Sequence, residues 1–115
     1  MIENLKEEIT RLHAQICSGL ADPIRILIIY TLADGTKNVS ELSQLLAIPQ
    51  PTVSRHLKVL REYNIVRSER DGNSMIYELK DRRFIEALDI LRQILADNLE
   101  DQAALAEQAS QNLKY

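Results

Sequence analysis

The sequence predicts a mainly α-helical domain with one small β-hairpin. Five segments carry apolar residues at the three- and four-residue intervals of a helix. One further stretch alternates apolar and polar residues on both sides of the turn signal Asp71-Gly72-Asn73. The chain has 115 residues, of which 45 % are apolar and one is cysteine. That composition fits one domain over residues 1–115 and leaves the cysteine without a partner for an intrachain disulfide.

The first helix is expected at residues 2–20. Its apolar residues form a narrow seam, typical of a helix that pairs with another helix. They are Ile2, Leu5, Ile9, Leu12 and Ile16. Asp22 can cap a second helix, and Pro23 suits the first position of that helix. The following residues are apolar almost all round until Asp34-Gly35, which predicts a helix buried at the centre of the domain.

Two further helices are expected after this central one. Asn38 and Glu41 have the spacing of a capping box, which predicts a short third helix ending near Leu46. The turn Ala47-Ile48-Pro49 separates it from a fourth helix at residues 50–63. Because proline cannot supply a capping side chain, the start of the fourth helix must be fixed otherwise, as by Pro51.

The alternating stretch predicts strands at residues 65–70 and 74–79. Asp81 then caps a last helix that is expected to reach Leu113, a length of roughly 50 Å at 1.5 Å per residue. Together, the two terminal helices have more apolar surface than one small core can use. Residues 2–20 and 81–113 are therefore expected to be the dimerisation helices of a homodimer.

The predicted order of four helices, two strands and a last helix describes a winged helix-turn-helix. In such a domain the second helix of the pair fits the major groove of double-stranded DNA, and the hairpin reaches an adjacent groove. The net charge is −3, yet residues 50–80 carry six Lys/Arg against four Asp/Glu. A local basic face is enough for phosphate binding. The expected DNA-contacting residues are Gln50, Thr52, Ser54, Arg55, His56, Lys58, Arg61, Arg67 and Arg70.

Four runs of residues follow the pattern of a known family. They are Leu20-Ala21-Asp22-Pro23-Ile24-Arg25-Ile26-Leu27, Val39-Ser40-Glu41-Leu42, Pro51-Thr52-Val53-Ser54-Arg55-His56-Leu57-Lys58-Val59-Leu60 and Ile76-Tyr77-Glu78-Leu79. On these runs the chain resembles the ArsR/SmtB family of winged-helix repressors. The resemblance covers about residues 20–79. It implies a homodimer held by the first and last helices, an operator with two half-sites, and repression that an inducer releases.

The metal sites of that family can be compared with this chain residue by residue. The arsenic-type site uses two cysteines at the start of the third helix, where this chain has Asn38-Val39-Ser40. The zinc-type site on the last helix matches Asp81, Arg83, Ile94 and Asp97, so an arginine and an isoleucine replace both imidazoles. Neither site is expected to bind its metal, and no cofactor is expected.

Cys17 and His13 are the remaining candidates for a sensing site. They lie four residues apart on the first helix and so would share one face. Two such pairs in a dimer could supply four metal ligands, or Cys17 could respond to oxidants. The simpler explanation is an inert cysteine and a surface histidine. An organic inducer, another protein acting through the last helix, or no ligand at all also fits, so the inducer is unknown.

The residues favour a DNA-binding regulator over two other classes. A winged-helix module for protein interaction, without specific DNA binding, would not need Arg55, Lys58, Arg67 and Arg70 on one side. An enzyme is not expected, because the chain shows no nucleophile–base arrangement and no glycine-rich phosphate loop. No apolar run approaches the roughly 20 residues of a membrane span. The amphipathic, acidic N-terminus is not typical of a signal peptide, so a cytoplasmic protein without membrane contact is expected.

Overall fold

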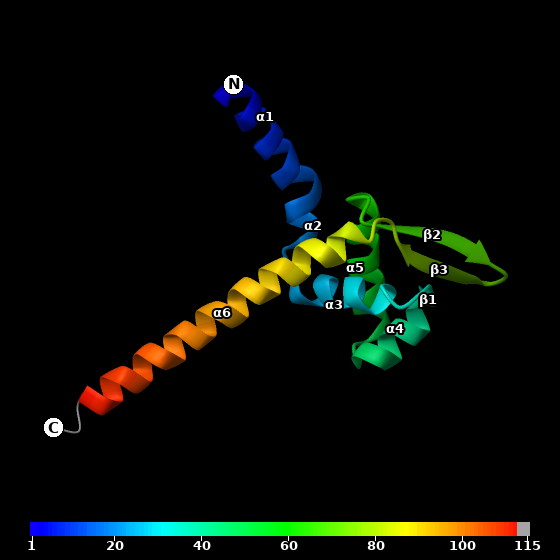
Figure 1. Ribbon diagram of the computed structural model, residues 1–115. Coiled ribbons are helices and arrows are strands. Elements are labelled where there is room, and N and C mark those ends of the chain that lie inside the picture. The colour runs from blue at the N-terminus through cyan, green and yellow to red at the C-terminus, as the bar shows by residue number, and fades with distance from the viewer. Residues whose placement is uncertain (113–115) are drawn as a thin grey trace. The chain divides into compact units, whose positions relative to one another are not determined.

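The computed structural model describes residues 1–112, and Figure 1 shows helices with one small antiparallel sheet. Two compact units are present, Met1–Arg82 and a second that begins at Arg83. The elements of the first unit are α1 (Ile2–Leu12), η1 (His13–Cys17), α2 (Ser18–Leu20), α3 (Pro23–Leu32), β1 (Lys37–Asn38), α4 (Val39–Leu46), α5 (Gln50–Glu62), β2 (Val66–Asp71) and β3 (Ser74–Leu79). The second unit is described by α6 (Arg83–Asn112). The predicted fold class is confirmed, while Leu113, the predicted end of the last helix, lies outside the described residues.

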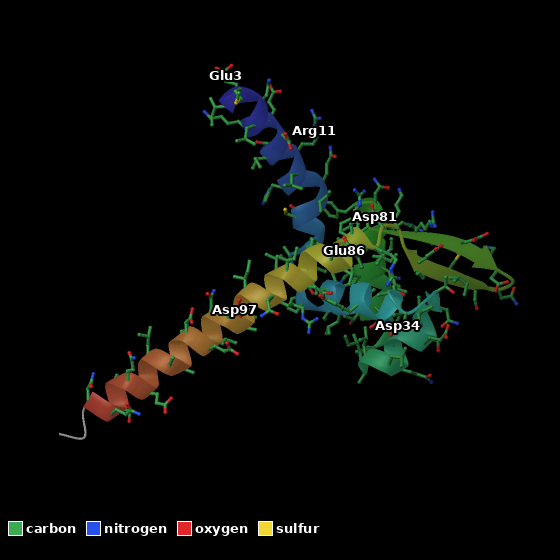
Figure 2. All side chains as sticks on the ribbon, in the orientation of Figure 1. Glu3, Arg11, Asp34, Asp81, Glu86 and Asp97 are labelled. Carbon is green, nitrogen blue, oxygen red and sulfur yellow. The ribbon has the colours of Figure 1, made fainter. Side chains whose placement is uncertain are left out.

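The N-terminal segment is helical from Ile2 to Leu20, as predicted, but η1 is a π-helical turn. The hydroxyl of Ser18 donates to the carbonyl oxygen of His13 at 2.9 Å. A π-helical turn pairs residues five apart, one more than an α-helical turn, and the spacing of the apolar residues does not predict it. All α1 side chains are exposed, and Figure 2 shows Glu3 and Arg11 projecting from this helix.

Helix α3 lies at the centre of the first unit. The side chain of Asp22 accepts a hydrogen bond from the backbone N–H of Ile24 at 2.8 Å, so the predicted cap is present. Pro23 occupies the first helical position, where no N–H is required. The buried apolar residues of this unit are Ile28, Ile29, Leu32, Leu42, Val53, Leu57, Leu60, Ile65, Val66 and Leu79. They come from α3, α4, α5 and the two long strands, which therefore share one core.

Helices α4 and α5 form the predicted helix-turn-helix pair. The side chain of Asn38 accepts from the N–H of Glu41 at 2.8 Å, and the Glu41 side chain accepts from the N–H of Asn38 at 3.0 Å. This reciprocal pair is the predicted capping box. Helix α4 ends at Ala47, whose φ of +55° is in the left-handed region. The N–H of Ile48 then donates to the carbonyl of Ser43 at 3.1 Å, which closes the turn.

The sheet has the strand order β1-β3-β2, and all neighbouring strands are antiparallel. Its third strand, β1, pairs Lys37 with Tyr77 and was not predicted, because two residues are too few to show an alternation. Strand β2 begins one residue later than expected. The N–H of Ile65 donates to the carbonyl of Leu60 at 2.9 Å, so Ile65 closes the turn after α5, and the strand begins at Val66. Figure 1 shows the β2–β3 hairpin extending beyond α3, α4 and α5.

Within residues 1–112, no single helix is both long and apolar enough to cross a bilayer. The bent pair formed by Ile2–Leu20 and Pro23–Leu32, at 82° to each other, passes by length and composition, as do buried core helices generally.

The capping box predicts a measurable contribution to stability. Replacing Asn38 with Ala removes the side-chain acceptor for the first turn of α4 and should lower the free energy of unfolding by about 1 kcal/mol. Urea denaturation followed by circular dichroism measures this change. Ser40→Ala is the matched control, since Ser40 is exposed in the same turn. Equal losses for both variants would contradict the capping role.

Candidate nucleic-acid interface

Helix α5 separates its buried and exposed residues cleanly. Val53, Leu57 and Leu60 are buried in the core. The opposite face carries most of the residues predicted to contact DNA. Of these, Gln50, Ser54, Arg55, Lys58 and Arg61 are exposed, and Thr52 is half-buried. One face of a rigid helix therefore presents two hydroxyls, an amide and three cations.

The start of α5 is fixed without a capping side chain. Pro49 precedes the helix, and its carbonyl accepts from the N–H groups of Thr52 and Val53 at 3.0 and 3.1 Å. Pro51 lies in the first turn, where a missing N–H costs no intrahelical hydrogen bond. The absence of a capping side chain at Pro49 therefore does not prevent α5 from beginning at Gln50.

The cations near the hairpin differ in their surroundings. A guanidinium N–H of Arg61 donates to the hydroxyl of Ser68 at 3.4 Å, which links α5 to β2. Arg67 pairs with Glu78 across the β2–β3 ladder at 3.1 Å. Arg70 is exposed beside the tip of the hairpin, where Gly72 adopts a φ of +64°. The predicted wing residues are therefore on one hairpin, but Arg67 shares its charge with a carboxylate.

The Arg67–Glu78 ion pair shifts the pKa of both side chains. The hydrogen bond from Arg67, followed by its positive charge, holds the pKa of Glu78 below the ordinary value of 4.5. The same hydrogen bond, followed by the carboxylate charge, raises the pKa of Arg67 above its ordinary value. Arg67 therefore stays charged at any pH at which the protein is folded, and Glu78 decides whether the pair exists.

His56 differs from the other predicted contact residues because it is buried, with 7 % of its surface exposed. Its ring Nδ1 lies 3.3 Å from a guanidinium nitrogen of Arg25, and its Nε2 lies 4.0 Å from Asp22 Oδ1. Partial burial raises the pKa of Asp22. The hydrogen bond from Ile24, then the charges of His56 and Arg25, outweigh it and lower that pKa below its ordinary value. The sequence predicts that His56 contacts DNA and does not place Arg25 in the site. The sequence feature that could have identified Arg25 is its position as a lone cation in an apolar helix.

The candidate sensing residues lie on the π-helical turn. Cys17 is a free, exposed cysteine, and His13 is also exposed. Within residues 1–112, no group of three or more His, Cys, Asp or Glu side chains is placed to hold a metal ion. At the start of α4, Asn38 is engaged in the capping box. Among the described residues, Cys17 and His13 are therefore not joined by a third such side chain.

Several known proteins resemble this chain in sequence. The family described as bacterial regulatory protein, arsR family, matches residues 22–68. The HTH-type transcriptional repressor SmtB of Mycobacterium tuberculosis is 39 % identical over 74 residues, which are 64 % of this chain and 55 % of that protein. The HTH-type transcriptional regulator Rv0081 of the same organism is 35 % identical over 102 residues, which are 88 % of this chain and 90 % of that protein.

Solved structures show the same architecture. The crystal structure of Rv0081 has a TM-score of 0.72 at 33 % identity and covers 83 % of this chain and 96 % of that chain. The transcriptional repressor BigR from Xylella fastidiosa has a TM-score of 0.69 at 31 % identity and covers 82 % and 95 %. A helix-turn-helix pair followed by a two-stranded wing defines the winged helix-turn-helix transcription regulators. Within that class, this chain belongs to the arsR family of bacterial regulatory proteins.

The Arg67–Glu78 pair should make the stability of the wing depend on pH. Because the pKa of Glu78 is lowered by folding, the pair stabilises the folded protein above pH 4.5, and this contribution disappears as the pH falls through the lowered value. Urea midpoints should show native protein slightly more stable than Glu78→Gln at pH 7, with the difference shrinking as the pH falls below 4.5. The control Glu62→Gln, on α5, should show no such convergence. A difference that stays constant or grows as the pH is lowered would contradict the pairing.

Proposed function

We propose that this chain is a homodimeric repressor that binds a specific double-stranded DNA operator through α5. The observation that carries the proposal is the two-sided character of α5, whose apolar face is locked in the core while the polar face is exposed. A helix held in this way can enter the major groove without rearranging. The protein acts by binding and release, in the cytoplasm, and the inducer that releases it is unknown.

The side chains of α5 divide into two groups by position. Gln50, Ser54 and Arg55 lie in the first turns, which approach base edges when such a helix enters the major groove. Glutamine can bind adenine, and arginine can bind guanine, each with two hydrogen bonds. Lys58 and Arg61 lie further along the helix and suit phosphate contacts. His56 is buried against Arg25, so we propose that it supports the helix from inside and does not contact a base.

The wing is proposed to contact DNA mainly through Arg70. This residue lies at the tip of the hairpin, the part that reaches furthest into an adjacent groove. Arg67 is paired with Glu78, so its net attraction for phosphate is reduced. Glu69 and Asp71 place further negative charge on β2. Binding strength should therefore come chiefly from α5.

The dimer is proposed to form through residues 2–20 and 81–113. Both helices, as far as they are described, expose a row of large apolar side chains. Surfaces that face water rarely carry such rows. On α1 these are Ile2, Leu5, Ile9 and Leu12, and on α6 they are Ile90, Leu91, Ile94, Leu95, Leu99 and Leu105. Two-fold symmetry would place two copies of α5 about one helical turn of DNA apart, roughly 34 Å, on a palindromic operator.

Repression is favoured over activation by the named relatives. SmtB and BigR, which share 39 % and 31 % identity with this chain, are both named transcriptional repressors. Their names describe those proteins, and the inference to this chain rests on the shared fold and on the exposed face of α5.

The DNA-binding proposal is tested with a duplex selected by the native protein from a randomised library. Fluorescence anisotropy should show sequence-dependent binding whose affinity falls steeply with salt. The double variant Arg55→Glu, Lys58→Glu should lose at least about 100-fold in affinity, because it removes a base contact and a phosphate contact. The matched control Lys6→Glu, Arg11→Glu changes the same charge on α1 and should bind within about 2-fold of native.

Two results would contradict the DNA-binding proposal. One is equal, weak binding of native protein to all duplexes, which would favour a protein-interaction module. The other is an equal loss of affinity in the α5 variant and in the α1 control, since that would mean that only the total charge matters.

The dimer predicts a clear response to one substitution. Ile9→Asp places a charge in the exposed seam of α1 and should convert the dimer to monomer, as measured by size-exclusion chromatography with light scattering. The side chain of Ile9 is 51 % exposed, so the folded protomer should tolerate the change. Leu45→Asp, on α4, is the matched control and should leave the dimer intact. A native protein that is monomeric at micromolar concentration would contradict this proposal.

A further inference from the structure

Arg25 makes a set of contacts that the DNA-binding face does not explain. It lies on α3, away from the exposed side of α5, and is half-buried. Its Nε donates to the carbonyl oxygen of Gly19 at 2.8 Å, and its Nη2 donates to the carbonyl oxygen of Ser18 at 3.2 Å. Its Nη1 lies 3.3 Å from the Nδ1 of His56 on α5. One guanidinium therefore joins α2, α3 and α5.

The carbonyl of Gly19 needs a donor because the N-terminal helical segment ends there, whereas the carbonyl of Ser18 also accepts from the N–H of Ala21 at 3.4 Å. In a continuing helix the carbonyl of Gly19 would accept from the residue four positions later, which is Pro23 and has no N–H. The backbone also leaves helical geometry at Ala21, where ψ is +42°. Arg25 supplies the missing donor and places positive charge at the negative end of the helix.

The contact with His56 has a defined polarity. An arginine can only donate, so this hydrogen bond forms with the neutral tautomer in which Nδ1 carries no proton. The other ring nitrogen, Nε2, is 4.0 Å from Asp22 Oδ1, the oxygen that caps α3. The first turn of α3 therefore holds His56 from two sides, with Arg25 on one nitrogen and Asp22 beside the other.

A second contact holds the same helical segment against the far end of α5. A Cβ atom built on Gly19 would lie 2.7 Å from Cδ1 of Ile65 and 3.0 Å from Cβ of Tyr63. Ile65 is fully buried and Tyr63 follows the last residue of α5. The segment that ends at Leu20 thus packs against the residues that directly follow α5, and Arg25 links the same segment to His56 on α5.

We infer that Arg25 is a positioning residue that fixes the direction of α5 relative to the N-terminal helical segment. In the proposed dimer that segment contacts the partner, so the same contacts set the separation of the two copies of α5. The guanidinium can reach three acceptors in one plane, which a lysine ammonium cannot do. For its consequence on DNA, this inference rests on the proposed function.

The direct test measures the protein without DNA. Spin labels are attached in a Cys17→Ser background at Glu7→Cys on α1 and Lys58→Cys on α5, both exposed positions. Labelled chains are diluted with unlabelled chains, so that distances within one chain dominate. Double electron–electron resonance should give a narrow distance distribution for the native sequence and a clearly broader one for Arg25→Lys. An unchanged distribution would overturn the inference, whatever the DNA result.

The matched control is Arg82→Lys. Arg82 also donates to a carbonyl at the end of a helix, that of Ala33 at 2.9 Å, but this contact is at the C-terminal end of α3 and does not involve α5. Its substitution should leave the α1–α5 distance distribution unchanged. Equal broadening in both variants would mean that any loss at a helix end loosens the domain, and would overturn the specific role of Arg25.

The second test uses the selected duplex with its half-sites moved apart in steps of one base pair. Arg25→Lys should bind the native spacing about 10-fold more weakly, a loss typical of energetic coupling between sites. It should discriminate less among spacings and bind a single half-site about as well as native. A simple loss of folded protein would weaken all duplexes equally and leave the spacing preference sharp, which would overturn the inference. If native protein binds no duplex while the distances still broaden, the positioning role stands and the proposed function fails.

Discussion

The organisation of the first unit follows from the two structural roles of α5. Thirteen residues must close the hydrophobic core on one side and present polar side chains on the other. Val53, Leu57 and Leu60 meet the first demand, at spacings of four and three that keep them on one face. Any shift of the helix along or around its axis would expose apolar side chains or bury a cation, and burying an unpaired cation costs several kcal/mol. The packing of α5 in the core therefore fixes the direction of its exposed face. The capped helices α3 and α4 supply other parts of that core.

Local chemistry explains why much of this fold is predictable. The caps at Asp22 and Asn38, the all-round apolar helix α3 and the turn signal at Asp71-Gly72-Asn73 each act within a few residues, and each is found as expected. One feature of the fold escapes such patterns because it depends on a distant part of the chain. Strand β1 exists because Lys37 lies beside Tyr77, forty residues away in sequence. It has no pattern of its own.

The candidate site also combines features that depend on neighbouring residues with features that depend on distant ones. The exposed residues of α5 follow from helical spacing alone, so they were correctly placed on one outer face. His56 was grouped with them because it lies among them in sequence, but it turns inward to meet Arg25, which is 31 residues earlier. A polar residue at a core position can be recognised from sequence only when its partner is known. The pairing of Arg67 with Glu78 is likewise a cross-strand property that depends on the register of the hairpin.

The π-helical turn at His13–Cys17 determines which changes of length the N-terminal segment can absorb. A π-helical turn takes one residue more than an α-helical turn to complete about the same rotation around the axis. Deleting one residue from η1 would therefore restore α-helical bonding while the seam of Ile2, Leu5, Ile9 and Leu12 kept its direction. Deleting one residue within α1 itself would instead rotate the seam residues before the deletion by about 100° relative to those after it. A one-residue change of length is thus tolerated at this turn and not in the helix that precedes it.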